Sequence, residues 1–145
     1  MSKKQIKIGV NQGSGSRFLW NAWILTCSQD EATRFLSNAQ YEHLAQQVQT
    51  LAEEISPSHS QTCRVDAIED FFELRDWGGV LHPFNVRVFF GIDRNRTAIV
   101  VLGVLQKQNN GPTPVGDRLR MRRRWRKYNA GDYGYPDTPP SEKNT

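Results

Sequence analysis

Residues 85–107, NVRVFFGIDRNRTAIVVLGVLQK, decide the fold of this 145-residue chain. Residues 85–92 and 98–107 are rich in β-branched and aromatic side chains, which favour strands. The four residues between them, 93–96, have the length and polar composition of a hairpin connection. The sequence therefore predicts two neighbouring antiparallel strands.

Three further segments extend this prediction toward the N-terminus. Residues 70–77 (DFFELRDW) predict a third antiparallel strand. Residues 18–27 are apolar on both of their alternating faces, which is typical of a strand that is covered on both sides. Residues 4–10 (KQIKIGV) predict either an extra edge strand or a tail.

A helical hairpin is predicted between the first long strand and the antiparallel strands. Ser28 and Glu31 form a capping-box pattern, and apolar residues follow at helical spacing as far as Ala39. A second helix has apolar side chains in steps of four, three and four and ends at Ser56-Pro57, because proline disrupts a helix. These apolar positions are Leu44, Val48, Leu51 and Ile55.

The last predicted helix, residues 114–128, contains the basic run RLRMRRRWRKY. Thr113 is expected to cap it, with Pro114 at its first position. At 100° per residue one apolar stripe forms, which we expect to dock on the sheet with most of the cations facing outward. The stripe consists of Met121, Trp125 and Tyr128. The seven cations of the run are candidates to bind phosphate groups, and they are Arg118, Arg120, Arg122, Arg123, Arg124, Arg126 and Lys127.

Length and composition indicate a single α+β domain. Its expected limits are residues 17–128, with a tail or edge strand over 1–16 and a disordered Gly- and Pro-containing tail over 129–145. A mean hydropathy of −0.64 and the absence of a long apolar segment exclude an integral membrane protein. With two cysteines and no secretion signal, a cytoplasmic location is expected. No metal or cofactor is expected.

Charge is concentrated in the C-terminal part of the chain. Nine of the 19 Lys and Arg residues but only four of the 15 Asp and Glu residues lie in residues 107–145, and the net charge is +4. So dense a basic cluster favours a polyanionic partner, and a nucleic acid is the usual one. An acidic protein remains an alternative.

Three further cations lie in the predicted strands: Arg75, Arg87 and Lys107. One interpretation is that they share a concave face and bind a phosphate. The other is that Arg87 pairs with Glu73 across the strands and is structural. Glu73 also belongs to an acidic run, residues 66–76, which we interpret as a solvated entry to the strand rather than a set of metal ligands.

From residue 70 to residue 128 the chain resembles the RelE/ParE toxin superfamily, especially its HigB-type or phage Gp49-like branch. Four motifs in order carry the resemblance, and they are the ELR strand at 73–75, RVFF at 87–90, GVLQK at 103–107 and TP at 113–114. The helical hairpin extends it to residues 18–128. The implied fold is a RelE-like α+β domain in which an N-terminal strand and a helical hairpin pack on a small, mainly antiparallel sheet with a basic C-terminal helix.

The resemblance implies the toxin of a type II toxin–antitoxin system that cleaves mRNA on the ribosome. Cleavage proceeds by attack of a 2'-hydroxyl on the adjacent phosphate and needs no metal. The catalytic residues carried over are Arg75, Arg87, Lys107 and Tyr128, and the partners are a cognate antitoxin and ribosome-bound mRNA. The resemblance also implies that the seven cations of the basic run and Trp125 bind RNA, and that either Tyr128 or Trp125 stacks on a base. The alternatives are a ParE-like inhibitor of DNA gyrase and a catalytically inactive binding module of the same fold.

Overall fold

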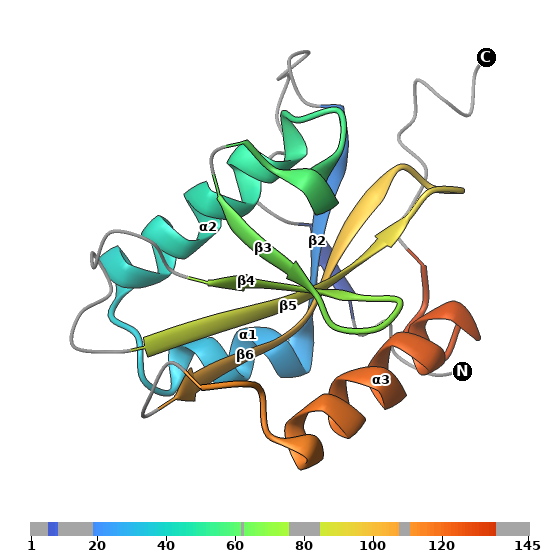
Figure 1. The fold of residues 1–145 in the computed structure, drawn as a ribbon. Coiled ribbons are helices and arrows are strands. Elements are labelled where there is room, and N and C mark those ends of the chain that lie inside the picture. The colour runs from blue at the N-terminus through green and yellow to red at the C-terminus, as the bar shows by residue number, and fades with distance from the viewer. Residues whose placement is uncertain (1–5, 9–18, 62, 76–84, 108–110, 136–145) are drawn as a thin grey trace.

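The computed structural model describes residues 6–8, 19–61, 63–75, 85–107 and 111–135. These residues form one six-stranded sheet with helices on both faces (Figure 1). The strands are β1 (Ile6–Ile8), β2 (Asn21–Leu25), β3 (Arg64–Ala67), β4 (Phe72–Arg75), β5 (Asn85–Asp93) and β6 (Ala98–Lys107). The helices are α1 (Thr26–Thr33), α2 (Asn38–Ala52), the short 3-10 helix η1 (Pro57–His59) and α3 (Val115–Asn129). The α+β class is confirmed. Among the described residues, no helix is long and apolar enough to cross a membrane.

The strands lie in the order β1-β2-β6-β5-β4-β3. The predicted hairpin of β5 and β6 forms the centre, and β4 pairs antiparallel with β5 as expected. The N-terminal strand β2 pairs parallel with β6, and β1 adds an antiparallel edge strand, which is one of the two predicted alternatives for that segment. β3 was not predicted, because four residues with two polar side chains give too weak a periodic signal.

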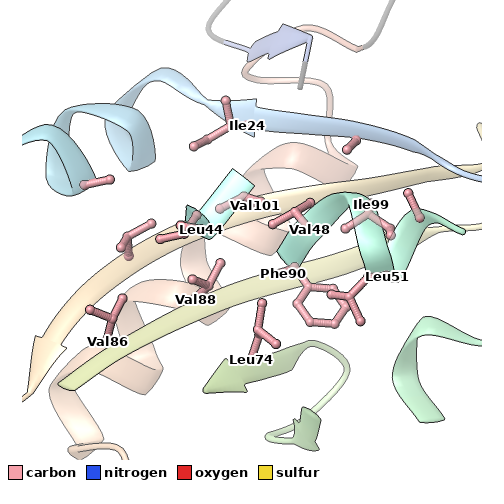
Figure 2. Packing of buried hydrophobic residues seen from close by; sticks show 14 of the residues in the cluster. Ile24, Leu44, Val48, Leu51, Leu74, Val86, Val88, Phe90, Ile99 and Val101 are labelled. Carbon is pink, nitrogen blue, oxygen red and sulfur yellow. The ribbon is translucent and has the colours of Figure 1, made fainter. Parts of the chain in front are cut away.

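Two hydrophobic layers cover the two faces of the sheet. On one face, α1 and α2 pack against side chains from β2, β4, β5 and β6, as Figure 2 shows for Ile24, Leu44, Val48 and Phe90. On the other face, α3 packs over a second cluster that contains Trp23 from β2. Successive side chains of β2 thus enter opposite layers, and the prediction that this strand is covered on both sides is confirmed.

The helical hairpin is present, but its first helix is shorter than predicted. α1 ends at Thr33, so Phe35 packs on the core from the following turn. The capping-box interpretation of Ser28 and Glu31 is wrong, since α1 has no side-chain cap. Ser28 instead donates from Oγ to the carbonyl oxygen of Val101 in β6, at 3.2 Å.

The second helix begins at a capping box that the sequence pattern did not reveal. The Ser37 hydroxyl accepts from the Gln40 N–H at 3.2 Å, and the Gln40 side chain accepts from the Ser37 N–H at 2.9 Å. The apolar pattern is right for the buried Leu44, Val48 and Leu51. It is wrong for Ile55, which lies beyond the end of α2 and is 85% exposed.

α3 docks on the sheet through Met121, Trp125 and Tyr128, all buried, which confirms the predicted stripe. Two strand glycines make the close approach possible. A Cβ on Gly91 would lie 2.3 Å from the Trp125 ring, and one on Gly103 would lie 2.3 Å from Met121 Cε. α3 begins at Val115 with Pro114 as its N-cap residue and no side-chain cap. The prediction that Thr113 caps this helix is therefore wrong.

Residues 130–135, beyond α3, are ordered, contrary to the prediction of a disordered tail from residue 129. The Tyr135 ring packs edge-on against Tyr128 with centroids 5.4 Å apart, and its hydroxyl donates to the Asn129 carbonyl oxygen at 2.6 Å. The segment after α3 thus covers Tyr128 at the C-terminal end of the helix. Residues 136–145 and 76–77, the end of the predicted 70–77 strand, lie outside the described residues.

The close approach of α3 predicts that Gly91→Ala is destabilising. The new methyl group would displace the Trp125 ring, and such overpacking typically costs about 1–3 kcal/mol. Urea unfolding, followed by the Trp fluorescence, measures the loss.

Gly116→Ala is the matched control, because Gly116 lies in α3 and a Cβ added there would have no other atom within 4 Å. Its stability should equal or exceed that of the parent, since alanine is the better helix former. Equal stability of the parent and Gly91→Ala would contradict this docking of α3.

Candidate functional site

A β-bulge in β6 determines which face of the sheet carries Lys107. Phe89 pairs with Gly103 but Phe90 pairs with Val101, so Leu102 has no partner of its own in β5. Uninterrupted alternation from Ala98, which lies on the α3 face, would place Lys107 on the opposite face, nine residues on. The extra residue shifts the alternation by one, and Lys107 lies on the α3 face.

Three arginines form a row across β3, β4 and β5 on that same face. Arg64 pairs in register with Arg75, and Arg75 pairs in register with Arg87. A parallel row, two residues along the strands, contains Asp66 opposite Glu73. Because residues in register share a face, cations and carboxylates alternate over one end of the sheet.

Glu73 is the centre of this charged cluster, and it is fully buried. Its carboxylate accepts from Arg75 Nε at 3.2 Å, from Arg87 Nη1 at 3.1 Å and from the Thr113 hydroxyl at 2.5 Å. These three donors come from β4, from β5 and from the segment that leads into α3. Glu73 therefore links the sheet to the start of the basic helix.

Arg87 is the structural member of the cluster. It is 0% exposed, its Nη1 binds Glu73 and its Nη2 donates to the Gly111 carbonyl oxygen at 3.2 Å. This is the cross-strand pair of the second interpretation, and the role of Arg87 as a direct phosphate ligand is corrected accordingly. The interpretation of the acidic run as solvated is wrong for Glu73, since the ion pair holds that carboxylate in the core.

The accessible cations of the cluster are Arg75 and Lys107. The Arg75 side chain is 18% exposed, and its Nε also lies 3.3 Å from Asp66. Lys107 Nζ donates to the carbonyl oxygens of Gly111 and Pro112 at 2.5 and 2.8 Å. An ammonium group has three protons, so one remains for a ligand. Arg64, 45% exposed, lies at the outer end of the row.

The pKa of Lys107 is lowered, first by burial and next by the positive charge of Arg87. Arg75 acts in the same direction, while Glu73 opposes it. A lysine with a lowered pKa loses its proton at a lower pH than an exposed lysine does. Lys107 is therefore the group in this cluster best suited to give up its proton and act as a base.

Tyr128 does not belong to this site. Its hydroxyl donates to Asp93 Oδ2 at 2.6 Å at the other end of β5, six residues from Arg87 and so about 20 Å along the strand. Burial and this hydrogen bond raise the pKa of Tyr128. The catalytic and base-stacking roles implied for Tyr128 and Trp125 gain no support from this geometry, because Tyr128 is fully buried and Trp125 is 6% exposed and stacks on Tyr128.

The cations of α3 fall into two groups. Arg124 is only 15% exposed and binds Glu31 and the Leu102 carbonyl oxygen, so the prediction that it faces outward is wrong. Other α3 cations have carboxylate partners as well: Arg118 and Arg122 at Glu69, and Arg120 at Asp117 and Glu31. Arg123, Arg126 and Lys127 are exposed, and no carboxylate of the described residues forms an ion pair with them.

Sequence reasoning missed Arg64, Asp66 and the role of Thr113. The first two lie in β3, which the sequence does not predict as a strand and whose Asp66 it assigns to a solvated acidic run. Thr113, predicted as a helix cap, instead donates to Glu73. The glycine at 103 was the one available signal for the bulge, because an isolated glycine within a strand often marks one. The glycine does not indicate which residue is left without a partner, or that Lys107 moves to the other face of the sheet as a result.

No protein-family model matches the chain, and no curated protein matches it either. Among the described residues, no group of three His, Cys, Asp or Glu side chains is placed to hold a metal ion. Any functional assignment therefore depends on the charged cluster and on the motif resemblance.

The buried pair predicts that Glu73→Gln is strongly destabilising. The substitution leaves the Arg87 guanidinium buried without a counter-charge, which typically costs about 3–5 kcal/mol. Denaturant unfolding at pH 7 measures the change. The double variant Glu73→Leu/Arg87→Met should regain much of the loss, because it removes both charges from the core.

Glu69→Gln is the matched control, because Glu69 pairs with Arg122, whose side chain is 35% exposed. Its effect should stay within about 1 kcal/mol, as for other surface ion pairs. If Glu73→Gln were no more destabilising than Glu69→Gln, the Glu73–Arg87 pair would not organise this end of the sheet.

Proposed function

We propose that this protein is a cytoplasmic toxin that cleaves mRNA on the ribosome. The observation that carries the proposal is the bulge in β6, which puts Lys107 on the sheet face that carries Arg75 and the buried Arg87. The order of strand, helical hairpin, antiparallel strands and basic helix agrees with the architecture that the motif resemblance implies. A cognate antitoxin is the implied partner.

In this proposal the substrate phosphate binds at Arg75 and Lys107. Arg87 does not contact the phosphate, and its charge acts on Lys107 through space while Glu73 opposes it. The neutral Lys107 amine accepts the proton of the 2'-hydroxyl as that oxygen attacks phosphorus. Arg75 stabilises the charge on the phosphorane. The 5'-oxygen leaves with a proton from water, and the upstream fragment ends in a cyclic phosphate.

A second candidate is a non-catalytic binding module of the same fold, such as a gyrase inhibitor. The observation that favours it is the burial of Arg87 and Tyr128, which removes two of the four catalytic residues that the resemblance implies. Such a module requires the fold and an exposed surface, but no proton acceptor at Lys107. The two candidates therefore differ in how they respond to substitution of this lysine.

The proposal predicts that Lys107→Arg abolishes mRNA cleavage while the protein stays folded. Arginine keeps the positive charge but does not give up its proton, so the rate should fall by about 100-fold or more. The parent rate on programmed ribosomes should rise with pH toward the lowered pKa of Lys107, because the neutral amine is the active form. Primer extension across the mRNA, at several pH values, measures both effects.

Lys127→Arg is the matched control, since Lys127 is exposed and lies twelve residues, about 18 Å, along α3 from Val115, and arginine keeps the charge that is expected to bind RNA. It should cleave at the parent rate. Growth arrest with intact mRNA and stalled replication would favour the gyrase inhibitor. Equal activity of Lys107→Arg and the parent would exclude Lys107 as the proton acceptor.

A further inference from the structure

Two of the exposed large apolar side chains lie on one face of α3. Val115 is 59% exposed and Leu119 is 41% exposed. They are four residues apart in the helix, so they are neighbours on its surface. The other exposed large apolar residues of the described chain, Leu19 and Ile55, lie elsewhere, near the end of α2.

Exposed cations continue this face toward the end of the helix. At 100° per residue, Val115, Leu119, Arg123 and Arg126 lie within about 80° of one another, opposite the buried Met121 and Tyr128. We call these four residues the α3 outer face. It has an apolar first half and a basic second half. Intramolecular ion pairs engage other α3 arginines, but in the described part of the chain none engages Arg123 or Arg126.

We propose that the α3 outer face binds an acidic amphipathic helix of a partner protein. Apolar side chains of that helix would cover Val115 and Leu119, and its carboxylates would pair with Arg123 and Arg126. A helix that lies against another helix presents anchors at the same three- and four-residue spacing. The charge complementarity is direct, because both cations are exposed and neither forms an ion pair within the described residues, although Arg126 acts on Glu69 at longer range.

The composition of the face favours a protein over RNA. Proteins that bind single-stranded RNA combine cations with exposed aromatic rings on which bases stack. The aromatic residues of α3, Trp125 and Tyr128, are buried on its other side. Aliphatic side chains such as Val115 and Leu119 gain more from contact with apolar groups than from contact with a phosphate backbone. This inference does not depend on the proposed mRNA cleavage.

The test is a binding measurement with a designed probe. The probe is a fluorescein-labelled helical peptide, about five turns long, that has leucines at three- and four-residue spacing on one face and glutamates on both sides of that face. A peptide of the same composition in scrambled order tests for charge alone, and a short oligouridine tests for RNA. By fluorescence polarisation at physiological salt, the ordered peptide should bind in the micromolar range and at least about 10-fold tighter than either control.

Substitutions on the face should weaken peptide binding selectively. Leu119→Asp and Arg126→Glu should each reduce the affinity at least about 10-fold, whereas Ile55→Asp, an exposed apolar site elsewhere, should leave it unchanged. Circular dichroism checks that each variant is folded. Should Leu119→Asp unfold the protein, Val115→Ser replaces it, with the same expectation.

Three results would overturn the proposal. Equal binding of the ordered and scrambled peptides would show that charge alone attracts the probe. An unchanged affinity in the face variants would place the binding elsewhere on the protein. Tighter binding of the oligouridine, lost in Arg126→Glu but kept in Leu119→Asp, would assign the face to RNA.

Discussion

The buried ion pair between Glu73 and Arg87 is the constraint on which this end of the molecule depends. Both side chains are taken out of water, and each is compensated by the other and by further hydrogen bonds. Because Thr113 and Gly111 supply some of those bonds, the same pair fixes the chain that leads into α3. The orientation of the basic helix on the sheet thus follows in part from one carboxylate.

A second constraint comes from unequal strand lengths. β2 pairs with β6 only as far as Val101, and β6 continues for six more residues. Side chains replace the missing strand: Glu31 accepts from the Val104 N–H at 3.1 Å, and Arg124 donates to the Leu102 carbonyl oxygen at 2.8 Å. Glu31 and Arg124 also bind each other, so α1 and α3 are joined across the open edge of β6. Arg124, although it belongs to the basic run, therefore stabilises the fold.

These two constraints separate the cations into structural and accessible ones. Arg87 and Arg124 satisfy buried partners, whereas Arg75 and Lys107 keep access to solvent at the charged cluster, and Arg123 and Arg126 lie on the α3 outer face. The buried arginine still matters to the accessible lysine, because its charge contributes to the lowered pKa of Lys107. The buried ion pair therefore affects the proposed chemistry through the charge of Arg87 on Lys107, and Arg87 itself does not contact the substrate in this proposal.

The sequence by itself determined the central hairpin, the doubly covered N-terminal strand, the helical pair and the docking stripe of α3, because each depends on local periodicity over eight or more residues. The sequence left two interpretations of Arg87 open and could not show on which face of the sheet Lys107 lies. Each question depends on which side chains meet across the strands. Only the tertiary structure decided them. The bulge at Leu102 shifts the alternation of β6 by one residue, and this shift brings Lys107 to the face that carries Arg75 and Arg87. A one-residue shift depends on how β6 pairs with β5 and how closely Met121 packs on Gly103, and these are contacts between segments distant in the chain.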